Sequence, residues 1–353
     1  MVRKQETSMT RFHSIFTGII TLLLTSLPAQ AADWQALPEQ APAPVDNPTT
    51  TEKVELGKAL FFDPRFSSTG TVSCNSCHNV MLGGEDNRPV SMGIHGKTGG
   101  RNSPTVWNSG FSASQFWDGR SPSLEEQAKG PVANLVEMGM ADVDTAMDRV
   151  RSIPGYKPMF EAAFGKNSMT VDNAARAVAA FERTLVTPNS PYDLYVKGNK
   201  KALSKQQVRG MNSFASLGCT SCHSGAAFNG PQMPEGNNFF MKFPTFADNT
   251  YVKKYELLAD KGRADVTGNE ADAYFFKVPT LRNVALTAPY FHNGRVDTLD
   301  EAVKVMAKTQ LNIELDKAQT DDLVAFLKAL TGEFPEIILP RLPPTEGWHI
   351  ETE

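Results

Sequence analysis

The chain has 353 residues, of which 41% are apolar and 21% are charged, and its formal net charge is −4. This length and composition are ordinary for a globular protein and provide material for two domains. The negative charge argues against a nucleic-acid-binding protein and favours a basic partner that is drawn in by long-range attraction.

Residues 1–31 are predicted to form a secretory signal peptide. Three basic residues precede an apolar run over 16–27, and Ala29-Gln30-Ala31 has the A-x-A pattern of a cleavage site. The run has about twelve residues, whereas a membrane-spanning helix needs roughly 20. We expect cleavage near Ala31, a periplasmic location and no membrane span in the mature chain, with Met9 as an alternative initiator. Removal of three basic groups and one acidic group changes the net charge from −4 to −6.

Apolar periodicity and capping residues predict a mostly helical chain. The Pro- and Ala-rich residues 32–48 predict an extended arm. Helices are expected over 52–62, from Ser123, over 142–153, over 171–186, from Ser204, from Thr298, and over 316–330 with Gly332 at the C′ position. One weak strand is expected over 274–278, and residues 224–272, rich in Gly, Pro and Asn, are expected to form long loops.

Two short motifs carry the chemistry. Cys74-Asn75-Ser76-Cys77-His78 and Cys219-Thr220-Ser221-Cys222-His223 both read C-x-x-C-H, the attachment site of a c-type haem. Two thiols at this spacing add to the vinyl groups of one porphyrin, and the next His binds the iron. The sequence therefore predicts two covalent haem c groups, attached through Cys74, Cys77, Cys219 and Cys222. His78 and His223 are the predicted proximal ligands. Covalent attachment outside the cytoplasmic membrane agrees with export.

Three other uses of the cysteines are weaker. A structural zinc with four thiolate ligands leaves the His after each motif unexplained. Paired disulfides suit small domains with a poor core, and this chain is large. A thioredoxin-like redox motif needs a βαβ context that the pattern does not show.

The two motifs lie in different halves of the chain, since His78 and His223 are 145 residues apart. In each half, helices, a C-x-x-C-H motif, loops and a closing helix follow one another as in a cytochrome c domain. We therefore predict an all-α fold with two cytochrome-c-like domains, over 49–188 and 189–334, with one covalent haem each, long loops and little β structure. The linker is expected near Thr187, and residues 335–353 form a Pro-rich tail.

The function of a haem depends on the sixth ligand of its iron. His95 lies in a Gly-rich loop 17 residues after the first motif, where it is either a removable ligand or a solvated loop histidine. His292 lies between aromatic residues and is better explained as a hydrogen-bonded structural histidine. Met306 is placed where a cytochrome c domain usually supplies its Met, and Met233 and Met241 are alternatives.

Peroxide or dioxygen chemistry also needs an acid–base group above the open iron. Glu137 is bordered by apolar residues, and burial there would raise its pKa and suit it to proton transfer. The alternative is a Glu that faces solvent.

Longer motifs give a specific resemblance. They are Leu56-Gly57-Lys58, Phe61-Phe62-Asp63-Pro64-Arg65, Cys77-His78-Asn79, Arg101-Asn102, Pro104-Thr105, Gln115-Phe116-Trp117-Asp118-Gly119-Arg120, Phe181-Glu182-Arg183-Thr184-Leu185, Lys277-Val278-Pro279, Leu281-Arg282-Asn283 and Pro289-Tyr290-Phe291-His292. From about Leu56 to Pro344, the chain resembles the bacterial dihaem cytochrome c peroxidase family.

The resemblance implies roles around the first haem. His78 would hold the low-potential haem where peroxide reacts, and His95 matches the releasable distal ligand. Glu137 matches the distal acid–base group, with Gln127 beside it. Trp117 matches an aromatic residue between the two haems.

Further roles follow for the second haem and for a metal ion. His223 and Met306 match the ligands of the high-potential haem, since a thioether favours reduced iron. Related dihaem enzymes that mature methylamine dehydrogenase use Tyr where Met306 stands. Asn102 and the backbone carbonyls of Thr287 and Pro289 match an interface calcium site with hard oxygen ligands.

The activity implied by the resemblance is reduction of hydrogen peroxide to water with electrons from a soluble cytochrome c or cupredoxin. A homodimer is implied as well, and so is opening of the His95 loop once the second haem is reduced. The other functions considered are a dihaem oxygenase, a maturation enzyme acting on a protein, and an electron carrier. The sequence has no third C-x-x-C-H, which excludes the trihaem relatives.

Overall fold

The structure is a computed structural model that describes residues 1, 34–233, 237 and 239–345. The described elements belong to one compact unit and are mostly helical, which confirms the predicted class. Two short strands, β1 (Phe240–Lys242) and β2 (Phe275–Lys277), pair in an antiparallel sheet. The predicted signal peptide and cleavage site lie outside the described residues.

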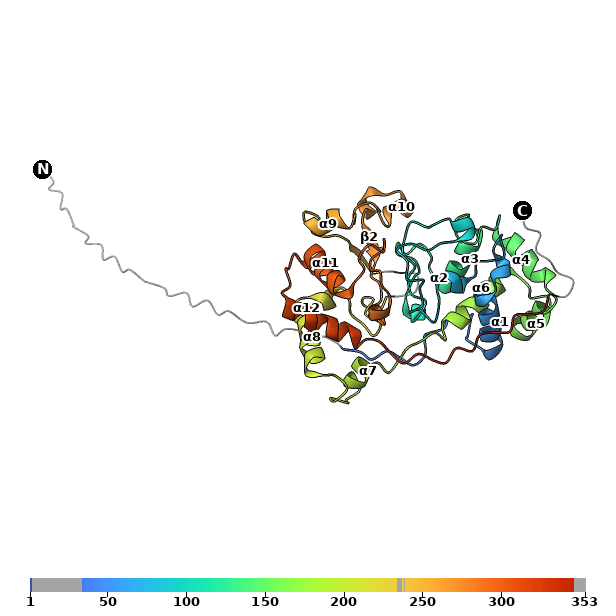
Figure 1. Cartoon of the computed structure of the whole chain (residues 1–353), viewed down its shortest axis with the longest axis horizontal. Coiled ribbons are helices and arrows are strands. Elements are labelled where there is room, and N and C mark those ends of the chain that lie inside the picture. Colours follow the sequence, from blue (N-terminus) through green and yellow to red (C-terminus); the bar gives the residue numbers. More distant parts are fainter. Residues whose placement is uncertain (2–33, 234–236, 238, 346–353) are drawn as a thin grey trace. The chain divides into compact units, whose positions relative to one another are not determined.

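The helices of the first half gather around α6. They are α1 (Thr51–Phe62), α2 (Cys74–Cys77), α3 (Leu124–Ala133), α4 (Val143–Ser152), α5 (Tyr156–Phe164) and α6 (Val171–Glu182), and Figure 1 labels them. Both α1 and α3 pack on α6. A Cβ at Gly57 would overlap the Ala177 carbonyl, so the missing side chain lets α1 approach α6 closely.

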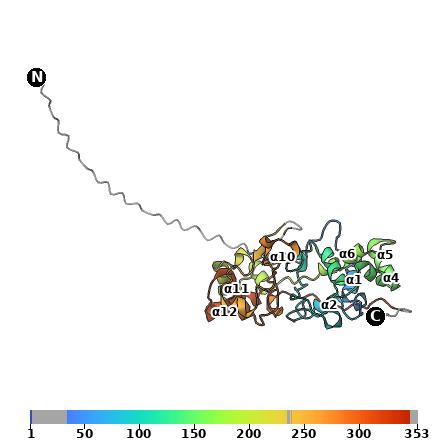
Figure 2. The same ribbon diagram turned by 90° about the horizontal axis from the view of Figure 1, so that it is seen from above.

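The second half contains α7 (Pro191–Val196), α8 (Lys205–Ser216), α9 (Thr250–Lys254), α10 (Ala264–Thr267), α11 (Leu299–Leu311) and α12 (Lys317–Lys328). A Cβ at Gly210 in α8 would overlap the Asp322 carbonyl in α12, so this pair also meets through a glycine. The turned view in Figure 2 again shows α11 beside α12 and α1 beside α6. Six short 3-10 turns complete the elements: Pro64–Phe66, Ile94–Gly96, Ser109–Phe111, Cys219–Ser221, Glu270–Asp272 and Val284–Leu286.

Side-chain caps explain where the helices begin. Thr50, Ser123, Asp142, Ser204 and Thr298 each accept a hydrogen bond from a backbone N–H in the first turn of the helix that follows. Such a cap satisfies a donor that has no partner within the helix. The predicted helix starts are therefore confirmed to within a residue.

Each half has its own apolar core. One core includes Leu56, Phe61 and Phe181, and the other includes Phe214, Phe228 and Phe326. The halves are joined by segments without regular structure. In the N-terminal arm, Trp34 packs on Tyr192 and Phe326 of the second half, and the Asn47 side chain donates to Glu125 in the first.

The C-terminal tail crosses in the opposite direction. Phe334 follows α12 and packs edge-on against Trp107, with the ring centroids 4.8 Å apart. Further along, Pro343 contacts Gly155, and its carbonyl accepts a hydrogen bond of 3.1 Å from Arg65. The two terminal segments therefore tie the halves together.

Several predicted boundaries were wrong. Helix α6 ends at Glu182 and not at Val186, because the residues after it turn and bury Leu185 and Val186 outside the helix. Gly332 is not the C′ residue of α12, which ends at Lys328; a Cβ at Gly332 would overlap the Thr187 carbonyl. The pattern also missed α5, and β1, α9 and α10 lie in the segment expected to be loops.

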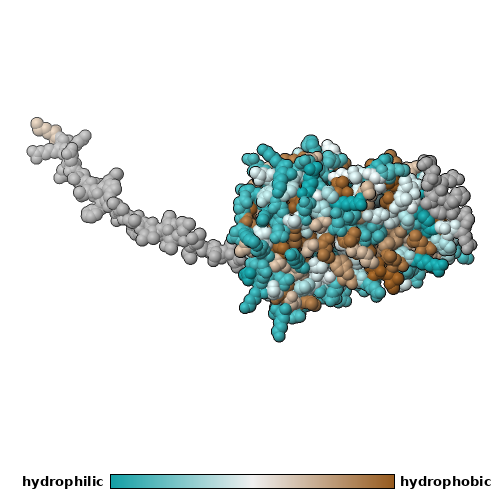
Figure 3. Space-filling model, in the orientation of Figure 1, coloured by the Kyte–Doolittle hydropathy of each residue, from teal (hydrophilic) through white to brown (hydrophobic). Residues whose placement is uncertain are grey.

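The viewed surface is mixed in polarity. Figure 3 shows mostly hydrophilic residues on this face, with apolar residues in small groups. Among the described residues, no helix combines the length and the apolar character that a bilayer crossing requires.

Candidate haem sites

The first C-x-x-C-H motif forms a short helical turn. Ser73 and Ser76 cap the start of α2 reciprocally, and the His78 backbone N–H donates to the Cys74 carbonyl at 2.9 Å. The turn holds Cys74 and Cys77 one after the other, with His78 at its end. The four cysteines of the chain are free, and the described residues contain no group of three or more Cys, His, Asp or Glu that could hold a metal. A four-thiolate zinc site would require such a group.

The His78 ring is fixed in the tautomer that an iron ligand needs. Its Nδ1 lies 3.0 Å from the Pro104 carbonyl oxygen and 3.2 Å from Ser103 Oγ. Because a carbonyl only accepts, Nδ1 carries the proton and Nε2 keeps its lone pair for a metal. Burial lowers the pKa of His78, which keeps the imidazole neutral.

The second motif repeats this arrangement with different partners. Gly218 has a φ of +92° and leads into the 3-10 turn Cys219–Ser221. The ring of His223 is only 8% exposed, and its Nδ1 lies 3.0 Å from the Phe228 carbonyl oxygen. Its Nε2 is therefore the unprotonated nitrogen, and burial lowers the pKa of this His as well.

A cavity of about 280 Å³ adjoins the second motif. Its walls include Cys219, Cys222, His223 and Met306, and most of the lining is apolar, as a buried porphyrin requires. Met306 on α11 therefore shares a cavity with His223. The alternative Met241 also lines this cavity, whereas Met233 lines a different one.

The loop that carries His95 is joined to the segment that carries Glu137. The Ile94 N–H donates to the Glu137 carbonyl at 2.9 Å, and Lys97 Nζ donates to the Leu135 carbonyl at 3.2 Å. A Cβ at Gly93 would overlap the carbonyls of residues 136 and 137, so glycine permits this close approach. His95 is exposed in the turn Ile94–Gly96, with a left-handed φ of +54°.

Glu137 is half-buried, in a turn that follows α3. Its Oε1 accepts a hydrogen bond of 2.9 Å from Asn134 Nδ2. Burial raises the pKa of the Glu137 carboxyl, and the nearby positive charge of Arg120 opposes this shift. Gln127 lies on α3, and its side chain is also half-buried. The raised pKa suits a group that holds and releases a proton.

The cavity at the second motif also collects residues from the first half. Trp117 and Asn102 line it, and the Trp117 indole N–H donates to the Asn102 carbonyl at 2.9 Å. Thr287 and Pro289 line the same cavity. The Asn102 side-chain nitrogen donates to the Arg88 carbonyl at 2.9 Å, which leaves Oδ1 able to accept from another partner or to bind a cation.

His292 lies among aromatic rings, as expected from its neighbours in the sequence. Its ring stacks on Phe276 at 4.5 Å between centroids and meets Trp117 edge-on at 6.3 Å. The prediction that it is hydrogen-bonded through its ring was wrong for one nitrogen, since Nε2 is buried without a partner among the described residues. Burial lowers the pKa of His292 to about 4, so the ring is neutral.

Sequence reasoning missed the groups that orient the two histidines. The acceptors are the backbone carbonyls of Pro104 and Phe228, and a main-chain oxygen leaves no signal in residue types. Lys277 was also missed as part of the second site. It lines the cavity, and burial lowers its pKa to about 8.

Two C-x-x-C-H turns, each with an imidazole whose Nε2 is free for iron, are the features of a c-type cytochrome with two haems. The family model for di-haem cytochrome c peroxidase matches residues 51–201. The chain is 43% identical to a cytochrome c551 peroxidase of Nitrosomonas europaea over 335 residues, which cover 95% of this chain and 96% of the relative. It is 45% identical to a cytochrome c551 peroxidase of Pseudomonas aeruginosa, with 89% and 88% covered.

A solved structure agrees with these sequence matches. A MauG-like protein associated with microbial copper homeostasis aligns with a TM-score of 0.74 and 30% identity, covering 84% of this chain and 94% of that one. The chain therefore belongs to the di-haem cytochrome c peroxidase family, and the resemblance inferred from the motifs is confirmed.

Proposed function

We propose that this protein is a periplasmic dihaem peroxidase that reduces hydrogen peroxide to water with electrons from a soluble cytochrome c or cupredoxin. The observation that carries the proposal is the pair of C-x-x-C-H turns whose histidines both keep Nε2 free. Relatives named cytochrome c551 peroxidase match most of the chain. Two cytochrome-c-like domains, over 49–188 and 189–334, remain our proposal for its organisation.

The residues present fit two covalent haem c groups. Cys74 and Cys77 would hold the first and Cys219 and Cys222 the second, each through thioether bonds. When bound, the haems supply iron for peroxide activation and for electron transfer. Met306 is the preferred second ligand for the haem held by His223, because it lies on a regular helix that faces the same cavity.

His95 and Glu137 have different tasks in this proposal. His95 would cover the distal side of the first site and release it when its loop shifts. The exposed position and left-handed turn of His95 support a loop that can move. Glu137 would take a proton from one peroxide oxygen and deliver it to the other, with Gln127 beside it. Its raised pKa supports this role.

Trp117, calcium and assembly complete the proposal. Trp117 links the halves through its bond to Asn102 and would lie between the haems. Asn102, Thr287 and Pro289 would hold one Ca²⁺ through oxygen atoms, and their shared cavity supports this assignment. A homodimer is retained as a prediction.

The variant Glu137→Gln tests the function directly. It keeps the size and one acceptor oxygen but cannot carry the proton, so kcat/KM for peroxide should fall by roughly 10²- to 10⁴-fold. Steady-state oxidation of reduced cytochrome c measures this, and the exposed Glu126 on α3 gives a matched control, Glu126→Gln. Full activity of Glu137→Gln would remove the acid–base assignment. Absence of peroxide turnover in the unmodified holoprotein would refute the peroxidase itself and favour an electron carrier.

A further inference from the structure

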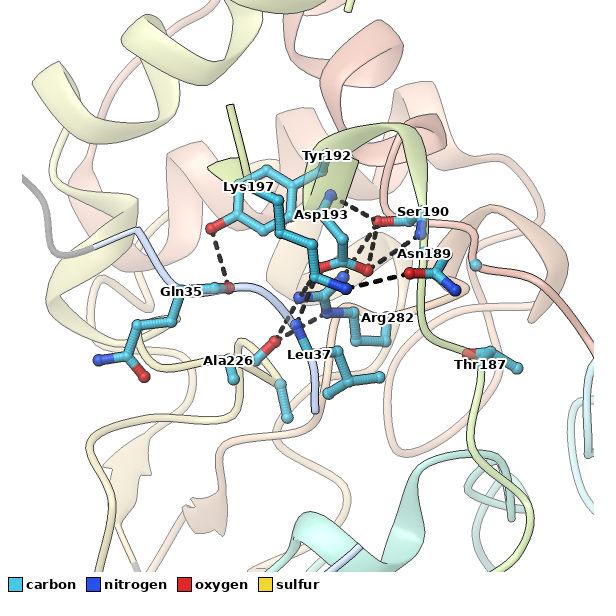
Figure 4. A network of polar contacts seen from close by, with 12 residues as sticks. Gln35, Leu37, Thr187, Asn189, Ser190, Tyr192, Asp193, Lys197, Ala226 and Arg282 are labelled. Atoms are coloured by element: carbon cyan, nitrogen blue, oxygen red, sulfur yellow. Dashed lines mark hydrogen bonds and ion pairs between the residues drawn. The ribbon is translucent and has the colours of Figure 1, made fainter. Parts of the chain in front are cut away.

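A fully buried ion pair lies next to the second C-x-x-C-H motif. Arg282 and Asp193 have 0% exposed side chains, and Nη2 lies 2.8 Å from Oδ1. Figure 4 shows that the pair is enclosed by a polar network. The Leu37 N–H and the Ser190 N–H and hydroxyl donate to the Asp193 carboxylate at 2.8 to 3.0 Å. A buried pair is tolerable when its remaining hydrogen-bonding groups are satisfied in this way.

The other donors of Arg282 reach the loop after the motif. Nε and Nη2 both donate to the Ala226 carbonyl, at 2.8 and 2.6 Å. The next carbonyl, that of Ala227, accepts a bond of 2.6 Å from the Thr280 hydroxyl. The Arg282 backbone N–H in turn donates to Thr280 Oγ1 at 3.1 Å. Two successive carbonyls are therefore fixed by one short segment of the chain.

The third carbonyl of this loop is the acceptor for the proximal histidine. Phe228 O accepts from His223 Nδ1 at 3.0 Å. Phe228 has a φ of +54°, a conformation that is strained for a large side chain and persists only where its surroundings hold it. The Arg282 guanidinium lies 5.3 Å from the Phe228 ring centroid and so contacts this residue too. The anchors on Ala226 and Ala227 hold the Phe228 carbonyl in line with the imidazole.

We propose that Arg282, held by Asp193, is a positioning residue that sets the reduction potential of the second haem through the Phe228–His223 hydrogen bond. A well-aligned acceptor on Nδ1 makes the imidazole a stronger donor and favours oxidised iron. Loosening the loop weakens that hydrogen bond and favours reduced iron. The potential of the second haem therefore rises when the anchor is lost.

This inference depends on the proposed haem at Cys219–His223, and the test separates the two. The purified holoproteins of Arg282→Lys and Thr280→Val are titrated in a spectroelectrochemical cell. Lys keeps the positive charge but loses the two-pronged bond to Ala226. Thr280→Val removes one anchor and leaves the ion pair intact, so it remains informative if Arg282→Lys does not fold. Arg209→Lys is the control, because its pair with Asp322 is exposed on the same half.

We expect the reduced-to-oxidised ratio of the second haem, at a fixed ambient potential, to rise about threefold or more in both variants. This corresponds to roughly 28 mV or more, from 59 mV per tenfold for one electron. The first haem and the Arg209→Lys control should not shift. An unchanged or lower potential of the second haem in both variants would overturn the positioning role. Absence of a second haem from the unmodified protein, measured by intact mass, would instead refute the proposed function.

Discussion

Glu182 is a buried carboxyl without a full set of partners, and its replacement by Gln should change how stability depends on pH. The side chain ends α6, the residue is 5% exposed, and Oε2 has no hydrogen-bond partner in the described part of the chain. Burial raises the pKa of Glu182 from 4.5 to about 8; Arg183 opposes the shift and Glu125 adds to it. The folded protein therefore keeps a proton that the unfolded chain releases above pH 4.5.

The sign and the size follow from this difference. The contribution of Glu182 to stability is fully present below pH 4.5 and is lost as the pH rises through about 8. Between these values the slope is about 1.4 kcal/mol per pH unit. From pH 5.5 to 7.5 the wild-type protein should lose about 2.7 kcal/mol that Glu182→Gln does not lose.

Urea unfolding of both holoproteins, followed by circular dichroism at pH 5.5, 6.5 and 7.5, measures this. Other titrating groups act equally in both proteins and cancel in the difference between them. The exposed Glu39 in the N-terminal arm provides the control Glu39→Gln, which should keep the wild-type pH dependence. Parallel curves for Glu182→Gln and wild type would show that Glu182 is ionised in the folded protein and would refute the reasoning.

Three further predictions concern the contacts between segments. Gly93→Ala should lower the free energy of unfolding by about 1–3 kcal/mol, because the new Cβ overlaps the Val136 carbonyl; unchanged thermal unfolding would contradict this packing. His95→Gly should give peroxide turnover without prior reduction of the second haem. If the as-isolated variant still requires reduction, measured by stopped-flow peroxide consumption, the gating role is wrong. Trp117→Phe removes the bond to the Asn102 carbonyl, and we expect weaker Ca²⁺ binding by calorimetry, by roughly fivefold for about 1 kcal/mol; equal affinity would separate this bond from the calcium site.

Much of the fold could be predicted from local signals. Helix starts depend on the cap and the first turn, so Ser123, Asp142 and Thr298 gave the right positions. Helix ends were less certain, because buried apolar residues continue beyond α6 without helical conformation. Gly332 looked like a helix terminator, yet it serves a close approach to residues 187–188 that only the folded chain brings together.

The candidate site was predictable where chemistry requires adjacent residues. The C-x-x-C-H spacing located both cysteine pairs and both proximal histidines. The groups that orient those histidines are distant in sequence or belong to the main chain, as Phe228 O and its anchor Arg282 illustrate. The joining of the His95 loop to Glu137 also depends on backbone bonds between distant segments, which no residue pattern reveals.

The central claim is that two haems are covalently attached and that only one iron exposes a vacant face. The most direct measurement combines the intact mass of the exported protein with an optical and spin-resonance titration in the presence of a small exogenous ligand. We expect the mass of the mature chain plus two haems, and binding of the ligand to one iron in the half-reduced protein. Fewer than two attached haems, or two irons that both stay closed to the ligand, would contradict the account.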